Sequence, residues 1–198
     1  MSRLSEEFYA SFEDLLSSAP PCPSLSMSNP LKLGSGTYGT VFAGNISPYG
    51  EVALKRMRLT EEDTPMQILR EIAVLNRLGC QNEQNRHQGI VRLFEWSISG
   101  SEVQLVFERL DCDLSVLLEI CKIPINILEN FISQILDAIS FCHQSGVAHR
   151  DLKPQNILVS LKTGKLKIAD FGLGRIINSQ IDTSLLTREI VSLLGFRV

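Results

Sequence analysis

The chain has 198 residues, of which 44% are hydrophobic, and a formal net charge of −3 at pH 7. A chain of this length holds one domain, or one domain and a fragment. It contains no basic run typical of nucleic-acid binding, no apolar segment near the roughly 20 residues that span a bilayer, and no signal-peptide pattern. We therefore expect neither a nucleic-acid nor a membrane partner.

The five cysteines are scattered and form no Cys-x-x-Cys pair. This usage favours reduced thiols in the cytosol or nucleus over a disulfide framework or a zinc site.

Residues 1–29 differ in composition from the rest. Phe8, Phe12, Leu15 and Leu16 recur at helical spacing, and residues 17–30 are rich in serine and proline. The segment is interpreted as a disordered leader with a transient helix, and the alternative is a short docking helix.

From residue 31 the pattern predicts three strands, a helix, two strands and then a mainly helical region. Thr64 suits the cap of the first helix, Pro65 its first position and Gly79 its end. Ile68, Ile72 and Leu75 form its apolar stripe, and Glu71 lies on the flank of that stripe. A long helix is expected over residues 125–145, with a broad apolar face made of Leu128, Phe131, Ile132, Ile135, Leu136, Ile139 and Cys142.

Gly34, Gly36 and Gly39 have the spacing GxGxxG, which also marks dinucleotide-binding turns. In those turns a helix follows the last glycine, whereas the residues after Gly39 are β-branched and aromatic and predict the return strand of a hairpin. This favours a glycine loop folded over phosphates, with Lys55 on the third strand reaching them.

Residues 149–156 read His-Arg-Asp-Leu-Lys-Pro-Gln-Asn, and Asp170-Phe171-Gly172 follows. Phosphoryl transfer needs a positioned nucleophile and neutralised phosphate charge. Asp151 as a proton acceptor, with Asn156 and Asp170 as oxygen ligands for Mg²⁺, meets both needs.

In their order along the chain, these motifs resemble the eukaryotic protein kinase family. The resemblance implies an α+β fold with an antiparallel sheet and one helix in an N-lobe (residues 30–109), a partial, mainly helical C-lobe (residues 110–198), and a leader (residues 1–29). Five segments are similar to cyclin-dependent kinases: residues 36–39, 65–71, 105–108, 113–114 and 187–193. The middle of residues 65–71 departs from the commonest form of that family. The long connection over residues 80–89 is similar to the subgroup served by D-type cyclins.

The resemblance also implies roles for single residues. Lys55 pairs with Glu71, Asp151 receives or orients the substrate proton, and Lys153 stabilises the transferred group. Mg²⁺ is held by Asn156 and Asp170. The ATP pocket is expected to comprise Leu33, Gly34, Gly36, Gly39, Val41, Ala53, Lys55, Phe107, Glu108, Leu110, Asp113 and Leu158.

In the same frame Arg70, Arg150 and Arg175 coordinate a phosphate on Thr187, while Thr37 and Tyr38 are inhibitory phosphorylation sites. The alternative for each hydroxyl is an unmodified solvent-facing group. The implied partners are a cyclin and protein substrates with Ser/Thr-Pro sites, and the implied location is nucleus and cytoplasm.

After Leu193 the family's Trp-Tyr-Arg-Ala-Pro-Glu continuation is absent. We therefore expect a chain truncated after the activation segment. Two functions follow: a cyclin-dependent-type serine/threonine kinase, or an inactive truncated isoform that binds cyclin and competes with a full-length kinase.

Overall fold

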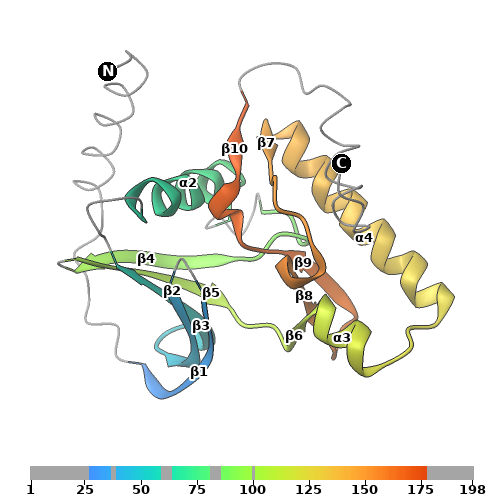
Figure 1. The fold of residues 1–198 in the computed structure, drawn as a ribbon, viewed down its shortest axis with the longest axis horizontal. Coiled ribbons are helices and arrows are strands. Elements are labelled where there is room, and N and C mark those ends of the chain that lie inside the picture. Colours follow the sequence, from blue (N-terminus) through green and yellow to red (C-terminus); the bar gives the residue numbers. More distant parts are fainter. Residues whose placement is uncertain (1–26, 37–38, 59–63, 81–85, 100, 178–198) are drawn as a thin grey trace. The chain divides into compact units, whose positions relative to one another are not determined.

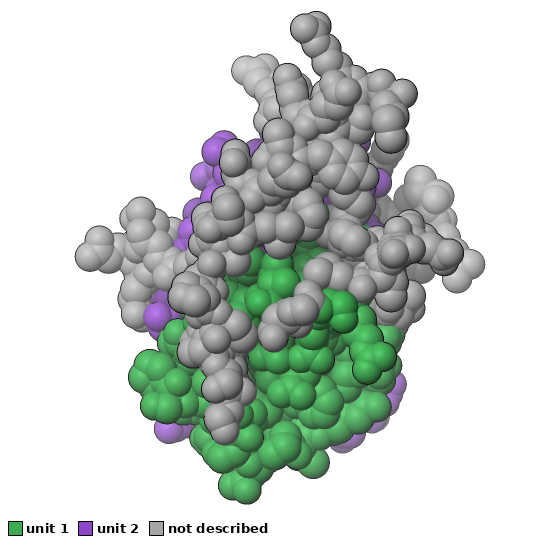
Figure 2. All heavy atoms as spheres, turned by 90° about the vertical axis from the view of Figure 1, so that its left-hand side faces the viewer, with its two compact units in different colours: residues 1–69, 93–108 green, residues 70–92, 109–198 purple. Residues whose placement is uncertain are grey.

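The computed structural model describes residues 27–36, 39–58, 64–80, 86–99 and 101–177. Its contacts divide the chain into two units, one of residues 1–69 and 93–108 and the other of residues 70–92 and 109–198 (Figure 2). The described part combines antiparallel sheets with helices, which confirms the expected α+β class (Figure 1). None of its helices has the length and apolar character needed to cross a membrane.

The first unit is built on a five-stranded antiparallel sheet. Its strands are β1 (Ser28–Gly36), β2 (Gly39–Ile46), β3 (Gly50–Arg58), β4 (Leu93–Ser99) and β5 (Glu102–Glu108). They lie in the order β1-β2-β3-β5-β4, so each strand pairs with a neighbour close in sequence. The strands predicted on both sides of the first helix are confirmed.

One face of this sheet carries an apolar cluster of Ile46, Val52, Leu54 and Val106, each at most 2% exposed. Tyr49 and Phe94 stack at its edge with ring centroids 4.9 Å apart. Because side chains alternate along a strand, the residues between them point to the opposite face.

Helix α2 (Thr64–Arg77) buries the predicted stripe, since Ile68, Ile72 and Leu75 are at most 2% exposed. Gly79 has a φ of +65°. The Gly79 amide donates to the Asn76 carbonyl and the Cys80 amide to the Leu75 carbonyl, each at 3.0 Å. This is the Schellman arrangement that ends a helix at a glycine, as expected.

The second unit contains helices α3 (Leu114–Ile120) and α4 (Ile125–Gln144), two 3-10 turns (Pro154–Asn156 and Phe171–Leu173) and five short strands. Strands β6 (Cys112–Asp113), β8 (Ile157–Ser160) and β9 (Lys165–Ile168) form one small sheet, and β7 (Val147–Ala148) pairs with β10 (Arg175–Ile176). Besides the expected helices, the region thus holds short strands around the motif of residues 149–156, including the β8–β9 hairpin.

Only part of the apolar face predicted for α4 is buried. The helix buries Phe131, Ile135, Ala138, Ile139, Cys142 and His143. Ile132 and Leu136, which the pattern placed on the same face, are 46% and 42% exposed. A stripe about 100° wide is enough to cover one neighbour, so residues on its flank stay in water.

Candidate active site

Four of the predicted ATP-pocket residues of the first unit share one face of its sheet: Val41, Ala53, Lys55 and Phe107. Val41 lies opposite Lys55, and Ala53 lies opposite Phe107. Ala53 and Lys55 are two positions apart on β3, so their side chains point the same way. That face, opposite to the apolar cluster, therefore presents an ammonium group beside small and aromatic side chains.

The three glycines of the loop differ in why they are glycines. A Cβ added at Gly34 or Gly36 meets no heavy atom of the described residues within 4 Å. At Gly39, with a φ of +135°, an added Cβ would lie 2.2 Å from the Arg56 carbonyl oxygen. Gly39 is thus required by strand pairing, whereas Gly34 and Gly36 leave open space beside the backbone. Leu33 is 50% exposed on β1.

In the second unit, Asp151 is the centre of a hydrogen-bonded group. Its Oδ2 accepts from Lys153 Nζ at 2.7 Å and from Asn156 Nδ2 at 3.0 Å. Asn156 Nδ2 also donates to the Asp151 carbonyl at 2.8 Å, and Asn156 itself is buried. The structure thus brings Asp151, Lys153 and Asn156 together, and their separate roles in the reaction stay predictions.

His149 holds this group against the segment that carries Asp170. Its Nδ1 accepts from the Asp151 amide at 3.3 Å, and its Nε2 lies 2.9 Å from the Ala169 carbonyl oxygen. Its ring also packs edge-on against Phe171, with centroids 4.7 Å apart. No role was predicted for His149 from the sequence, although its place directly before Arg150 and Asp151 was the available signal.

Asp170 adopts a left-handed conformation with a φ of +61°, which non-glycine residues use sparingly and which re-aims a side chain. Glu71 of α2 is only 3% exposed and is therefore not a solvated surface charge. Its Oε2 lies 4.0 Å from the position of a Cβ added at Gly172. The ion pair expected between Glu71 and Lys55 would connect the two units, and it stays a prediction.

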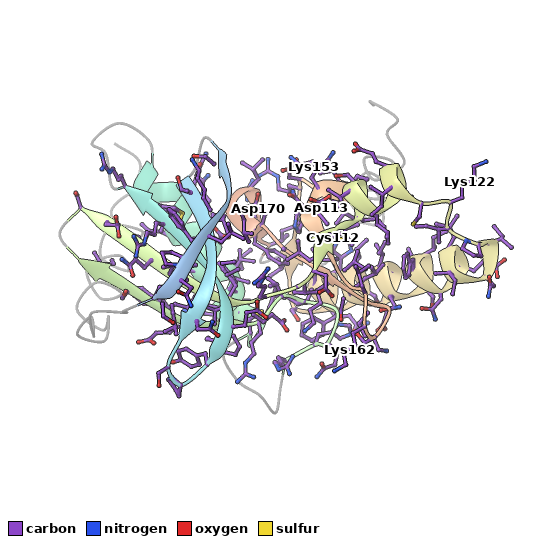
Figure 3. The ribbon with its side chains drawn as sticks, turned by 90° about the horizontal axis from the view of Figure 1, so that it is seen from below. Cys112, Asp113, Lys122, Lys153, Lys162 and Asp170 are labelled. Carbon is purple, nitrogen blue, oxygen red and sulfur yellow. The ribbon has the colours of Figure 1, made fainter. Side chains whose placement is uncertain are left out.

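The remaining pocket residues of the second unit lie close to the catalytic segment. Asp113 is paired with Leu158 between β6 and β8. Its Oδ1 accepts from the Val116 amide at 3.1 Å and so caps α3. Figure 3 labels Asp113, Lys153 and Asp170, and it shows Lys122 and Lys162 well away from them. Leu110, like Asp113 and Leu158, is half-buried, and Glu108 ends β5 in the first unit.

The predicted phosphate-coordinating arginines, Arg70, Arg150 and Arg175, are all exposed and all belong to the second unit. Arg175 lies opposite Ala148, two residues before Arg150. Thr37, Tyr38 and Thr187 lie outside the described residues.

The oxygen atoms near Asp151 suit a hard cation. The amide nitrogen of Asn156 is used by Asp151, which leaves its Oδ1 as the free ligand atom among the described residues. Carboxylate and amide oxygens are the ligands that Mg²⁺ prefers. Asn156 and Asp170 therefore fit a Mg²⁺ site, where the ion would neutralise phosphate charge.

Over residues 28–193 the chain matches the protein kinase domain family. That span includes both the sheet with its lysine and the segment with Asp151, and the chain belongs to the protein kinase family. Members of this family are transferases that generally use ATP and Mg²⁺ and act on protein substrates.

Proposed function

We propose that the chain is a cyclin-dependent-type serine/threonine kinase that transfers the γ-phosphate of ATP to Ser/Thr-Pro sites of proteins in the nucleus and cytoplasm. The observation that carries this proposal is the group formed by Asp151, Lys153 and Asn156. The thiols of Cys112 and Cys121, which form no disulfide in the described part of the chain, support the location, since such thiols are typical of reducing compartments.

The reaction follows from the atoms of Asp151. Its Oδ2 is occupied by Lys153 and Asn156, while its Oδ1 accepts no hydrogen bond within the described part of the chain. Oδ1 is thus the atom that orients the substrate hydroxyl and receives its proton. The hydroxyl oxygen forms a bond to the γ-phosphorus, the bond from that phosphorus to the bridging oxygen breaks, and ADP leaves.

Lys153 has a second use in this scheme. Its ammonium group lies 2.7 Å from Asp151 and its side chain is 44% exposed, so it remains accessible to an incoming phosphoryl group. A positive charge placed beforehand at the reacting atoms stabilises the charge of the transition state. Lys55, on the sheet, would serve the nucleotide phosphates in the same way.

Control by a cyclin is assigned to helix α2. Ile68 is 2% exposed and is therefore a core residue rather than a partner contact, whereas Arg70 is exposed. A partner that binds the exposed side of α2 would bias the position of Glu71 through its differential affinity for two states.

The test is a transfer assay with purified chain, Mg·ATP and a protein substrate with Ser-Pro and Thr-Pro sites, with and without cyclins. Asp151→Asn should abolish transfer. Arg70→Glu should weaken cyclin capture, with exposed Lys165→Glu as a surface control. Absence of transfer under all conditions would contradict the proposal.

A second candidate is a cyclin-binding chain without transfer activity. It is favoured by the exposed apolar side chains of α3 and α4, because unsupported helices hold a catalytic segment poorly. Cyclin capture without phosphoryl transfer identifies this function.

A further inference from the structure

The end of α2 and the residues after it are fastened to one stripe of α4. Arg77 Nε donates to the Ser145 carbonyl at 3.0 Å. The ring of His87 stacks on Phe141 with centroids 4.8 Å apart, and its Nε2 lies 3.1 Å from Asp137 Oδ2. Asp137, Phe141 and Ser145 are four residues apart, so they lie on one face of the helix. We name these contacts the α4 clasp.

The hydrogen bonds of His87 define which nitrogen carries a proton. The Gly89 amide donates to Nδ1 at 3.1 Å, so Nδ1 is an acceptor and Nε2 carries the proton toward Asp137. Gly89 must approach α4 closely, since a Cβ there would lie 2.8 Å from the Cβ of Ala138. The histidine therefore connects the backbone of residue 89 to α4.

The same backbone holds the strand that leads to Asp170. The Ile168 amide donates to the Gly89 carbonyl at 2.8 Å, and the Val91 amide donates to the Ile168 carbonyl at 3.0 Å. Ile168 is two residues before Asp170. The left-handed turn at Asp170 thus begins from a residue whose position depends on Gly89.

Helix α2 also touches the segment after Asp170. A Cβ added at Gly174 would lie 3.4 Å from Val74 Cγ2, and one at Gly172 would lie 4.0 Å from Glu71 Oε2. Asp170 therefore lies between two segments that the α4 clasp holds: residues 89–91 before it and α2 after it.

We propose that Arg77 and His87 are positioning residues for Asp170, and that the α4 clasp sets the affinity of the site for Mg²⁺. This inference rests on the proposed function, because it assumes that Asp170 binds the metal. Residues that orient a ligand from behind change metal affinity about 10–100-fold when substituted. The α4 clasp acts on Asp170 through one further contact, so we expect a smaller change in Mg²⁺ affinity, about three- to tenfold.

The experiment uses the full chain and the variants His87→Ala and Arg77→Ala. Binding of a fluorescent ATP analogue is titrated with Mg²⁺, and amide hydrogen exchange is followed at Ile168 and Val91. The Mg²⁺ concentration at half-saturation should rise about three- to tenfold for His87→Ala and less for Arg77→Ala. Exchange at both amides should become faster. Where kinase activity is measurable, kcat at saturating Mg²⁺ should change less than the Mg²⁺ requirement.

Gln134→Ala is the matched control. Gln134 also joins α4 to the β8–β9 hairpin, accepting from the Leu166 amide at 3.0 Å and donating to the Gly164 carbonyl at 3.1 Å. Its contacts are at the other end of β9, so it should lower the melting temperature without changing the Mg²⁺ requirement. His87→Asn, which can still accept from Gly89, should restore most of the affinity lost in His87→Ala.

An unchanged Mg²⁺ requirement in His87→Ala, or an equal rise in Gln134→Ala, overturns the proposal. If the wild-type chain binds no Mg²⁺–nucleotide complex, the proposed function fails. Amide exchange at Ile168 then still tests whether the α4 clasp holds residues 89–91. Unchanged exchange in both clasp variants then shows that residues 89–91 are held by other contacts. If His87→Ala does not fold, Arg77→Ala, at an exposed position, provides both measurements.

Discussion

Two regions of the second unit differ in the environment of their side chains. Between His149 and Phe171, polar groups are bonded to one another at 2.7–3.3 Å and much of the segment is buried. On α3 and α4, large apolar side chains face water. They are Val116, Leu118, Ile120, Ile125, Ile127, Ile132 and Leu136, each at least 41% exposed.

The difference shows that contacts between residues close in sequence can form the polar group, whereas burial of an apolar helix face depends on packing against distant segments. Asp151, Lys153 and Asn156 lie within six residues of one another, so one loop and one 3-10 turn assemble them. The apolar side chains of α3 and α4 need another element to cover them, and each forfeits about 1.5–3 kcal/mol when fully exposed rather than buried. We therefore expect the group around Asp151 to be well formed, while the exposed faces of α3 and α4 contribute little to stability.

The largest effects are expected on the rate of phosphoryl transfer when charged residues of the site are substituted. Asp170→Asn and Lys55→Met should each reduce phosphoryl transfer about a hundred- to thousandfold, since positioned charge supplies most of the catalysis. The melting temperature should change little. The measurement is the initial rate of peptide phosphorylation at saturating Mg·ATP.

Near-normal rates in either variant would falsify the assignment of the metal and phosphate groups. Lys162→Met, at an exposed position away from the site, is the matched control for Lys55→Met.

Two neighbouring residues of α4 test how much a buried and an exposed apolar side chain each contribute to stability. Ile135 is 4% exposed and Leu136 is 42% exposed. Ile135→Ala should lower the free energy of unfolding by about 2–4 kcal/mol, because a buried cavity is left behind, and Leu136→Ala by less than about 1 kcal/mol. Urea unfolding followed by circular dichroism measures both. Equal losses would show that Leu136 is covered in solution.

The sequence was sufficient for features that depend on neighbours along the chain. Gly79 predicted the end of α2, and the spacing of Ile68, Ile72 and Leu75 predicted its buried stripe. The motif around Asp151 predicted residues that the structure joins directly. The resemblance to the protein kinase family was confirmed over residues 28–193, whereas the cyclin-dependent subgroup stays a prediction.

Features that depend on distant segments were not predictable in the same way. The stripe formed by Asp137, Phe141 and Ser145 is visible only when the residues after α2 are placed against it. Likewise, periodicity could not decide between Ile135 and Leu136, because adjacent positions on a helix differ by 100° and the width of the covering neighbour is not encoded locally. The burial of Glu71 also required the segment around Gly172.

A smaller effect is expected at Asp113, which lies between the two regions. Its carboxylate caps α3 by accepting from the Val116 amide. Asp113→Ala should lower the free energy of unfolding by about 1 kcal/mol, whereas Asn caps almost as well as Asp and Asp113→Asn should be nearly neutral. Urea unfolding of the two variants is the measurement. If the residue also contacts the ribose, both variants should raise the KM for ATP, and a raised KM with only Asp113→Ala would assign it to the cap alone.

The smallest effect concerns the thiol of Cys112, directly before Asp113. Burial raises the pKa of this thiol, and the carboxylates of Asp113 and Asp111 and the nearby Cys121 raise it further. A raised pKa means that the thiolate forms only at higher pH, so alkylation of Cys112 by iodoacetamide should require higher pH in the folded chain than in urea. Peptide mass spectrometry at a series of pH values measures this for Cys112 alone. Asp113→Asn removes one negative charge while keeping the cap, so it should move the midpoint only part of the way down, because burial remains. A midpoint equal to that in urea would show that Cys112 is open to water, and the apolar exposure of α3 would then extend to β6.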